Sequence, residues 1–177
     1  MRELSLNVLD IAQNSITANA SLVTVEAIES TVLHTLTLRI ADNGKGMTQE
    51  QLDAVRDPFF TTRTTRKVGL GIPLFKMAAE MTGGTLEIES AVGKGTTVTA
   101  VFKTDNVDFT PLGDMTSTIV TLITMNTHID FVYNFIKDEH EFSLDTRKLK
   151  EILGDVSLSE PSIALWLTEY INENTNV

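Results

Sequence analysis

A carboxylate and two glycines lie close together in the segment Asp42-Asn43-Gly44-Lys45-Gly46. A carboxylate beside bare glycine backbone can accept a hydrogen bond from an amino group, whereas a keto oxygen at that place would leave the carboxylate unpaired. The segment is therefore suited to an adenine amino group. By itself, Asp-Asn-Gly is also typical of a tight turn after a strand.

A second pair of glycines, Gly69-Leu70-Gly71, stands directly before a predicted helix at Ile72–Met81. Backbone N–H groups at the start of a helix bind phosphate well, and glycine permits the backbone movement of a lid. The preceding residues 56–70 show no periodicity, and a loop of this length inside a domain is often a functional lid. Its basic residues could contact phosphates or could form only a solvated loop; they are Arg63, Arg66 and Lys67.

Asp10 and Asn14 lie four residues apart on a helix predicted for residues 3–18, so they share one face of that helix. The amide oxygen of Asn14 could take one position on an octahedral Mg²⁺, with phosphates and water at the others. Asp10 could orient or deprotonate a water for attack on a γ-phosphate. Considered singly, each residue is also an ordinary polar residue of a surface helix.

Taken in order, these motifs resemble those of the histidine-kinase-like ATPase superfamily. That superfamily includes DNA gyrase B, the heat-shock chaperone of ninety kilodaltons, the MutL mismatch-repair proteins and sensor histidine kinases. The resemblance covers residues 1–104. Its five motifs are similar to the N box (Leu9–Ser21), the first glycine box (Asp42–Met47), the phenylalanine-containing segment (Asp57–Thr62), the second glycine box (Val68–Ile72) and the third (Gly93–Thr97).

The resemblance implies an ATP site in which Asn14 binds Mg²⁺ and Asp42 binds the adenine amino group. It implies that Thr96 or Thr97 supports the adenine end and that residues 56–70 form the ATP lid. The full set of expected nucleotide-binding residues is Asn14, Asp42, Gly44, Gly46, Met47, Thr61, Arg63, Lys67, Gly69, Leu70, Gly71, Thr96 and Thr97.

One residue departs from the pattern of the superfamily. Its hydrolysing members usually carry a Glu four residues before the Mg²⁺-binding Asn, and this chain has Asp10 there. Two functions therefore stay open. The first is Mg²⁺-dependent ATP binding with slow ATPase or phosphotransferase activity toward a separate partner protein. The alternative is a non-catalytic switch module that binds a partner when its lid closes.

Helical and alternating patterns predict a largely antiparallel sheet with helices on one face. The resemblance implies that this α/β arrangement is the two-layer sandwich of the superfamily, with a mixed sheet. Residues 1–104 are expected to form the ATP-binding domain. Residues 105–177 are expected to form an acidic C-terminal extension or a small α/β subdomain. The predicted strands are 22–28, 32–41, 85–89, 96–102, 129–136 and 141–144, and the predicted helices are 3–18, 49–55, 72–81, 115–125, 146–153 and 161–172.

The net charge of −10 argues against nucleic acid as a partner, because phosphate backbones bind basic surfaces. Residues 106–177 contain 12 acidic and 4 basic residues, which indicates either a solvated surface or a face for a basic partner. Together with a likeness to small stand-alone ATP-binding proteins, this favours a protein partner that is basic or has a redox or regulatory role. No apolar run approaches the roughly 20 residues of a membrane span, and the N-terminus is not typical of a signal peptide, so the expected location is the cytoplasm.

Overall fold

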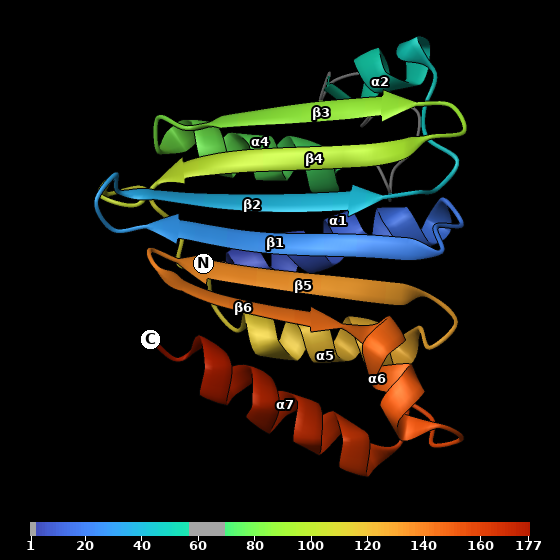
Figure 1. Ribbon diagram of the computed structural model, residues 1–177. Coiled ribbons are helices and arrows are strands. Elements are labelled where there is room, and N and C mark those ends of the chain that lie inside the picture. The colour runs from blue at the N-terminus through green and yellow to red at the C-terminus, as the bar shows by residue number, and fades with distance from the viewer. Residues whose placement is uncertain (1–2, 57–69) are drawn as a thin grey trace.

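The computed structural model describes residues 3–56 and 70–177, which form six helices around one six-stranded sheet (Figure 1). The strands are β1 (Leu22–Ser30), β2 (Thr35–Asp42), β3 (Thr85–Ala91), β4 (Gly95–Lys103), β5 (Asp130–Lys137) and β6 (His140–Asp145). The helices are α1 (Leu4–Thr17), α2 (Gln49–Arg56), α4 (Gly71–Met81), α5 (Met115–Met125), α6 (Thr146–Leu153) and α7 (Pro161–Thr175).

The strand order is β3-β4-β2-β1-β5-β6. The sheet combines three antiparallel hairpins, in which β1 pairs with β2, β3 with β4 and β5 with β6. The first two hairpins join through the antiparallel pair β2–β4, whereas β5 lies parallel to β1. The predicted mixed, largely antiparallel sheet is therefore confirmed.

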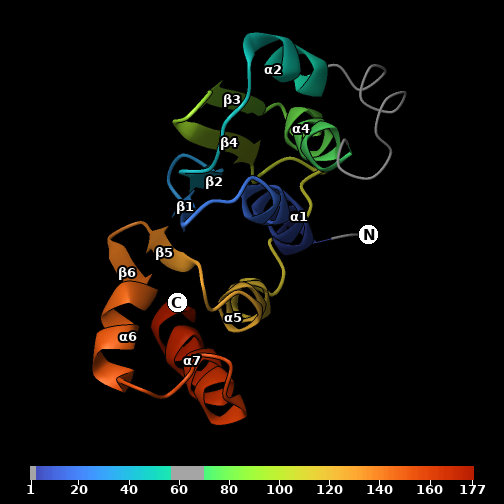
Figure 2. The ribbon, with the colours of Figure 1, turned by 90° about the vertical axis from the view of Figure 1, so that its right-hand side faces the viewer.

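One face of the sheet carries the core. Side chains alternate along each strand, so that Val23, Val25 and Ala27 of β1 are buried while the residues between them are partly exposed. Helices α1, α4 and α5 cover this face (Figure 2), as the two-layer prediction requires. At the centre of the core, the fully buried rings of Phe75 from α4 and Phe102 from β4 lie 5.6 Å apart.

The opposite face carries a row of polar side chains that crosses four strands. Arg39 of β2 donates to Glu26 of β1 at 2.9 Å. Glu26 also accepts from the Asn134 amide of β5 at 3.0 Å, and Ser143 of β6 donates to Asn134 at 2.7 Å. The sheet is therefore continuous from the N-terminal into the C-terminal part of the chain. The predicted division at residue 104 falls after β4 and stays a prediction.

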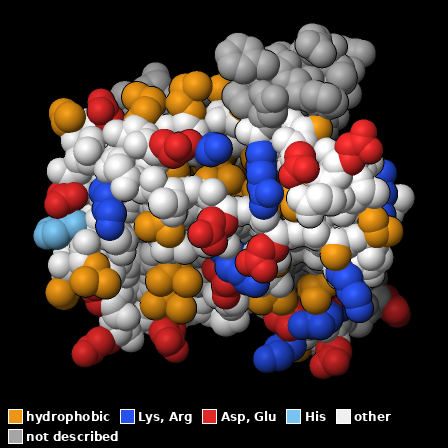
Figure 3. Space-filling model, turned by 90° about the horizontal axis from the view of Figure 1, so that it is seen from above, with side chains coloured by type: hydrophobic (Ala, Val, Ile, Leu, Met, Phe, Trp, Pro, Cys, Tyr) orange, Lys and Arg blue, Asp and Glu red, His pale blue; other side chains and the backbone are white. Residues whose placement is uncertain are grey.

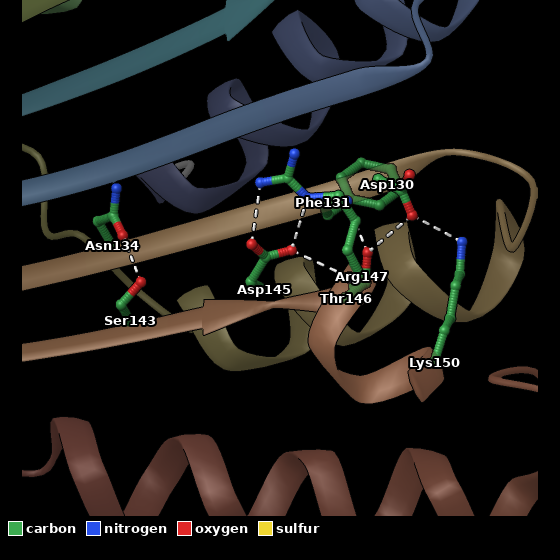
Figure 4. Close-up of polar contacts among 8 residues, drawn as sticks. All are labelled: Asp130, Phe131, Asn134, Ser143, Asp145, Thr146, Arg147 and Lys150. Atoms are coloured by element: carbon green, nitrogen blue, oxygen red, sulfur yellow. Dashed lines mark hydrogen bonds and ion pairs between the residues drawn. The ribbon is translucent and has the colours of Figure 1, made fainter. Parts of the chain in front are cut away.

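Helix α6 is fixed to the ends of β5 and β6 by charged pairs (Figure 4). Lys150 lies 2.8 Å from Asp130, and Arg147 lies 2.9 Å from Asp145. The buried Thr146 hydroxyl accepts from the backbone N–H of Phe131 at 2.9 Å. Two of the few bases of the C-terminal part are thus paired with its own acids.

Charges of both signs are mixed on one face of the molecule, which Figure 3 shows from above. On the described part of the face in Figure 3, Lys and Arg side chains lie next to Asp and Glu side chains. Nucleic-acid binding generally needs a clustered basic surface, and this mixture does not provide one there. Within the described residues, moreover, the helices are all too short or too polar to cross a lipid bilayer.

The prediction that the second strand begins at Val32 was wrong, because β2 begins at Thr35. Val32 and Leu33 lie in the β1–β2 turn and are 81% and 70% exposed. The turn is held by a hydrogen bond from the Leu33 N–H to the Ser30 hydroxyl and by His34 in the left-handed region, with φ of 53°. Two apolar residues at the tip of a turn extended the apparent alternation beyond the paired residues.

Helix α5, which leads from β4 to β5, begins with a strong N-cap. The Asp114 carboxylate accepts hydrogen bonds from the Ser117 N–H at 2.9 Å and from the Ser117 hydroxyl at 2.6 Å. These bonds hold the pKa of Asp114 below its ordinary value. The stabilisation is therefore present above the ordinary carboxyl pKa, and it is lost as the pH falls through the lowered pKa of the folded state.

We expect Asp114→Ala to lower the free energy of unfolding by about 1 kcal/mol at neutral pH, because the cap is lost. The difference from the native protein should shrink as the pH falls below the ordinary carboxyl pKa of about 4 and through the lowered pKa of the folded state. Urea unfolding followed by circular dichroism at neutral and acidic pH measures both effects. Asp108→Ala removes the same charge from an exposed turn nearby and should change stability little; an equal loss in both variants would contradict the capping role.

Candidate nucleotide-binding site

A cavity of about 230 Å³ opens beside the second half of α1, where β2 and β4 meet the turn after β2. Its walls combine apolar side chains with a few polar ones. The lining residues are Ile11, Asn14, Ser15, Thr17, Ala18, Ile40, Asp42, Lys45, Gly46, Met47, Val55, Ile72, Thr96 and Val98. A largely apolar cavity with few convergent polar groups is the usual form of a small-molecule site.

The Asp42 carboxylate is held in this cavity by three donors. Its Oδ2 atom accepts from the buried Ser15 hydroxyl at 2.6 Å. Its Oδ1 atom accepts from the Gly44 N–H at 2.8 Å and from the Thr96 N–H at 3.3 Å. A carboxylate offers about four acceptor positions, so roughly one remains for a ligand, at Oδ2. The carboxylate is thereby oriented before any ligand arrives.

Glycine is required where the turns around Asp42 touch other backbone. A β-carbon on Gly44 would lie 2.8 Å from the Ala18 carbonyl oxygen. Gly46 and Gly95 both have positive φ, and a β-carbon on them would overlap the carbonyl groups of Ala91 and Asp42. The turn after β2 and the turn before β4 therefore pack backbone to backbone, which only glycine allows.

Ser90 completes this arrangement from β3. Its hydroxyl accepts from the Met47 N–H at 2.9 Å and lies 2.7 Å from the Thr96 hydroxyl. The short helix α2 follows with a capping box, in which Thr48 accepts from the Gln51 N–H at 3.1 Å and Gln51 accepts from the Thr48 N–H at 2.9 Å. Thr48 thus caps the N-terminus of α2 and fixes the direction in which the chain leaves the cavity.

Asn14 and Asp10 occupy different positions relative to the cavity. Asn14 lines it, and its side-chain amide makes no hydrogen bond to another described residue. Asp10, one turn earlier, is exposed and lies at the junction of α1 with the start of α4, where a β-carbon on Gly71 would be 3.7 Å from that of Asp10. The Asn14 amide is therefore available to a ligand in the cavity, whereas Asp10 does not line the cavity and lies next to the first turn of α4.

The structure brings several of the expected nucleotide-binding residues together and separates others. Those that line the cavity are Asn14, Asp42, Gly46, Met47 and Thr96. Gly44 supports Asp42 without lining the cavity, and Thr97 points to the opposite face of β4 by the alternation of the strand. Leu70 is 40% exposed, and Gly71 begins α4. Thr61, Arg63, Lys67 and Gly69 lie outside the described residues, as does the expected lid at 56–70 apart from its end residues Arg56, the last residue of α2, and Leu70.

Ser15, Ser90 and Lys45 were not predicted as site residues. Ser15 occupies a core-facing position of α1 and is 2% exposed. A hydroxyl at an apolar position of a helix needs a buried partner, and this signal could have indicated its bond to Asp42. Ser90 gave no such signal, because it becomes part of the site only through the pairing of β3 with β4.

Comparison with known proteins agrees with this geometry. Residues 1–106 match the sequence family described as histidine kinase-, DNA gyrase B-, and HSP90-like ATPase. The sensor histidine kinase ZraS of Klebsiella oxytoca is 48% identical over 56 residues, which are 32% of this chain and 12% of the kinase. Sporulation kinase D of Bacillus subtilis (strain 168) is 42% identical over 62 residues, 35% of this chain and 12% of that kinase. The chain thus matches only a small part of these relatives.

A solved structure supports the fold over a longer stretch. The N-terminal domain of a DNA repair protein aligns with a TM-score of 0.53 at 15% sequence identity, covering 82% of this chain and 53% of that one. That likeness concerns the fold alone. Since the family match spans more than half of the chain and includes the residues around Asp42, the chain belongs to the histidine kinase-, DNA gyrase B-, and HSP90-like ATPase family.

Proposed function

We propose that this protein binds ATP together with Mg²⁺ and turns it over slowly, by hydrolysis or by phosphoryl transfer to a separate protein. The observation that carries the proposal is the Asp42 carboxylate, which three donors fix in a largely apolar cavity with about one acceptor position open. An adenine ring would lie against apolar side chains such as Ile40 and Val98, which are paired neighbours on β2 and β4, with its amino group donating to Asp42. A base with a keto oxygen at that position would leave the carboxylate unpaired.

The proposed Mg²⁺ would be held by the Asn14 amide oxygen. No cluster of three or more His, Cys, Asp or Glu side chains suited to a metal occurs among the described residues, so phosphate oxygens and water would supply the other ligands. This ligand set is usual for Mg²⁺, and the unpaired Asn14 amide fits it. When bound, the ion neutralises charge on the phosphates. Lys45, exposed at the cavity, is placed to add a further positive charge there.

Asp10 is the proposed general base for hydrolysis. It lies one turn before Asn14 on α1 and beside the first residue of α4, where helix N–H groups favour anions. Phosphoryl transfer is supported instead by the relatives, which are described as a sensor histidine kinase and a sporulation kinase. In that case the phosphate acceptor would be carried by another protein.

A protein partner is proposed to contact the acidic C-terminal part of the chain. Its bases Arg147 and Lys150 are paired internally, which leaves exposed acids in excess. The exposed acids of this part include Glu139, Glu141, Glu151, Asp155, Glu160, Glu169 and Glu173. Such a surface favours a basic partner and repels acidic ones.

Asp42→Asn tests the adenine assignment. We expect the affinity for ADP to fall about tenfold to a hundredfold, because the ligand loses a hydrogen bond to a charged acceptor and the new amide group faces donors. Isothermal titration calorimetry measures this affinity. Asp105→Asn removes the same charge from the exposed turn after β4 and should bind ADP as the native protein does. Equal ADP affinity in the native protein and both variants would exclude Asp42 as an adenine-binding residue.

Asp10→Asn separates catalysis from binding. If Asp10 is the base, phosphate release from ATP with Mg²⁺ should fall about a hundredfold or more, while ADP affinity stays close to the native value. The matched control is Asp53→Asn on the exposed surface of α2, which should leave release unchanged. Unchanged release in Asp10→Asn would exclude Asp10 as the base. Binding of ATP without any release by the native protein would instead support a kinase that needs its acceptor, or the switch module.

A further inference from the structure

A second cavity, of about 430 Å³, lies between β5, the start of α5 and the last turn of α7. Figure 1 shows the C-terminal end of α7 beside the beginning of α5. The cavity shares no lining residue with the one that contains Asp42. It is therefore separate from the proposed nucleotide site.

Tyr133 of β5 is a buried polar group of this cavity that lacks a protein partner. Its side chain is 98% buried, at 2% exposure, yet its hydroxyl makes no hydrogen bond to another described residue. Among the described residues, every fully buried side-chain polar atom has a hydrogen-bond partner. Since the Tyr133 hydroxyl has none, its oxygen is not fully buried, and it opens into the cavity that Tyr133 lines. Phenylalanine at this position would fill the core equally well without a hydroxyl to satisfy.

A second donor stands across the cavity on α7. The buried Thr116 hydroxyl of α5 donates to the Asn172 amide oxygen at 2.7 Å. This bond orients the amide so that its NH₂ group remains as a donor. The Tyr133 hydroxyl keeps its proton at neutral pH, because burial raises its pKa well above the ordinary value. Two groups that can donate, the Tyr133 hydroxyl and the amide of the exposed Asn172, thus line a cavity whose other walls include the apolar side chains of Leu112 and Phe135.

The charge at the cavity disfavours an anion. Among the lining residues that the structure describes, Asp114 is the charged one. Its hydrogen bonds to Ser117 lower its pKa, so it stays negative at neutral pH. A carboxylate or phosphate ligand would be repelled, whereas an uncharged carbonyl can accept from both donors without that cost.

We propose that this cavity binds a small uncharged molecule whose carbonyl or amide oxygen accepts hydrogen bonds from Tyr133 and Asn172 while its apolar part lies against Leu112 and Phe135. The volume lies within the range of small-molecule sites. The site is independent of the ATP site, and its occupation would rigidify the junction of α5, α7 and β5.

Benzamide and benzoate are matched probes, because they share a ring and differ in charge. Binding of each to the full chain can be followed by chemical-shift changes in two-dimensional amide NMR spectra. We expect benzamide to shift amide signals around residues 112–116 and 172–176 with a dissociation constant in the millimolar range, as befits so small a ligand. Benzoate should bind about tenfold more weakly, because Asp114 repels it.

Tyr133→Phe removes only the hydroxyl and should weaken benzamide binding about fivefold, whereas Tyr170→Phe, on α7 but outside the cavity lining, should not. Thr116→Val is a second variant: it removes the hydroxyl that donates to the Asn172 amide oxygen, so the Asn172 amide is no longer held in its orientation. ADP affinity should be unchanged in all of them, which keeps this test separate from the nucleotide site. Absence of benzamide shifts, equal binding of benzoate, or equal benzamide affinity in native protein and Tyr133→Phe would each overturn the proposal and leave a cavity that holds water only.

Discussion

The hydrogen bonding of one partly buried carboxylate constrains the whole N-terminal part of the molecule. Asp42 is stable at the edge of the core only because Ser15, Gly44 and Thr96 each donate to it. These donors come from α1, from the turn after β2 and from β4, so the carboxylate fixes a helix and two strands relative to one another. The neighbouring glycines follow from the same constraint, because the turns can reach their positions only without β-carbons. The proposed recognition of adenine thus uses a group whose position is already determined by folding.

Helix α1 connects this arrangement to the C-terminal part of the chain. Its second half lines the nucleotide cavity, and its first half packs against α5, where the Thr118 hydroxyl donates to the Ser5 carbonyl at 3.2 Å. Helix α5 in turn leads into β5, which pairs with β1 along its length. The C-terminal residues are therefore integrated into the same core, although the family match ends at residue 106. A partner that contacts this part would act on elements that support α1.

The two cavities differ in a way that suits different ligands. In the proposed nucleotide cavity a fixed acceptor, Asp42, would select a donor on the ligand, and the Asn14 amide is available to the proposed Mg²⁺. In the second cavity, between β5, α5 and α7, the proposed ligand-binding groups are the donors Tyr133 and Asn172. They would select a hydrogen-bond acceptor on the ligand. Both sites depend on polar groups that the fold has oriented but not fully satisfied. Such groups cost stability unless a ligand or water completes their hydrogen bonds.

The sequence by itself determined the elements and the chemistry of the N-terminal part, because both depend on local patterns. Strand alternation, the Thr48 cap and the glycine turns around Asp42 are each encoded within a few residues. Only the tertiary structure decided that Thr96 rather than Thr97 lines the cavity, that Ser15 and Ser90 support the site, and that β5 joins β1. The reason is that strand pairing and helix packing bring together residues far apart in the chain. Even the start of β2 at Thr35, where apolar turn residues mimic a strand, depends on which residues find partners across the sheet.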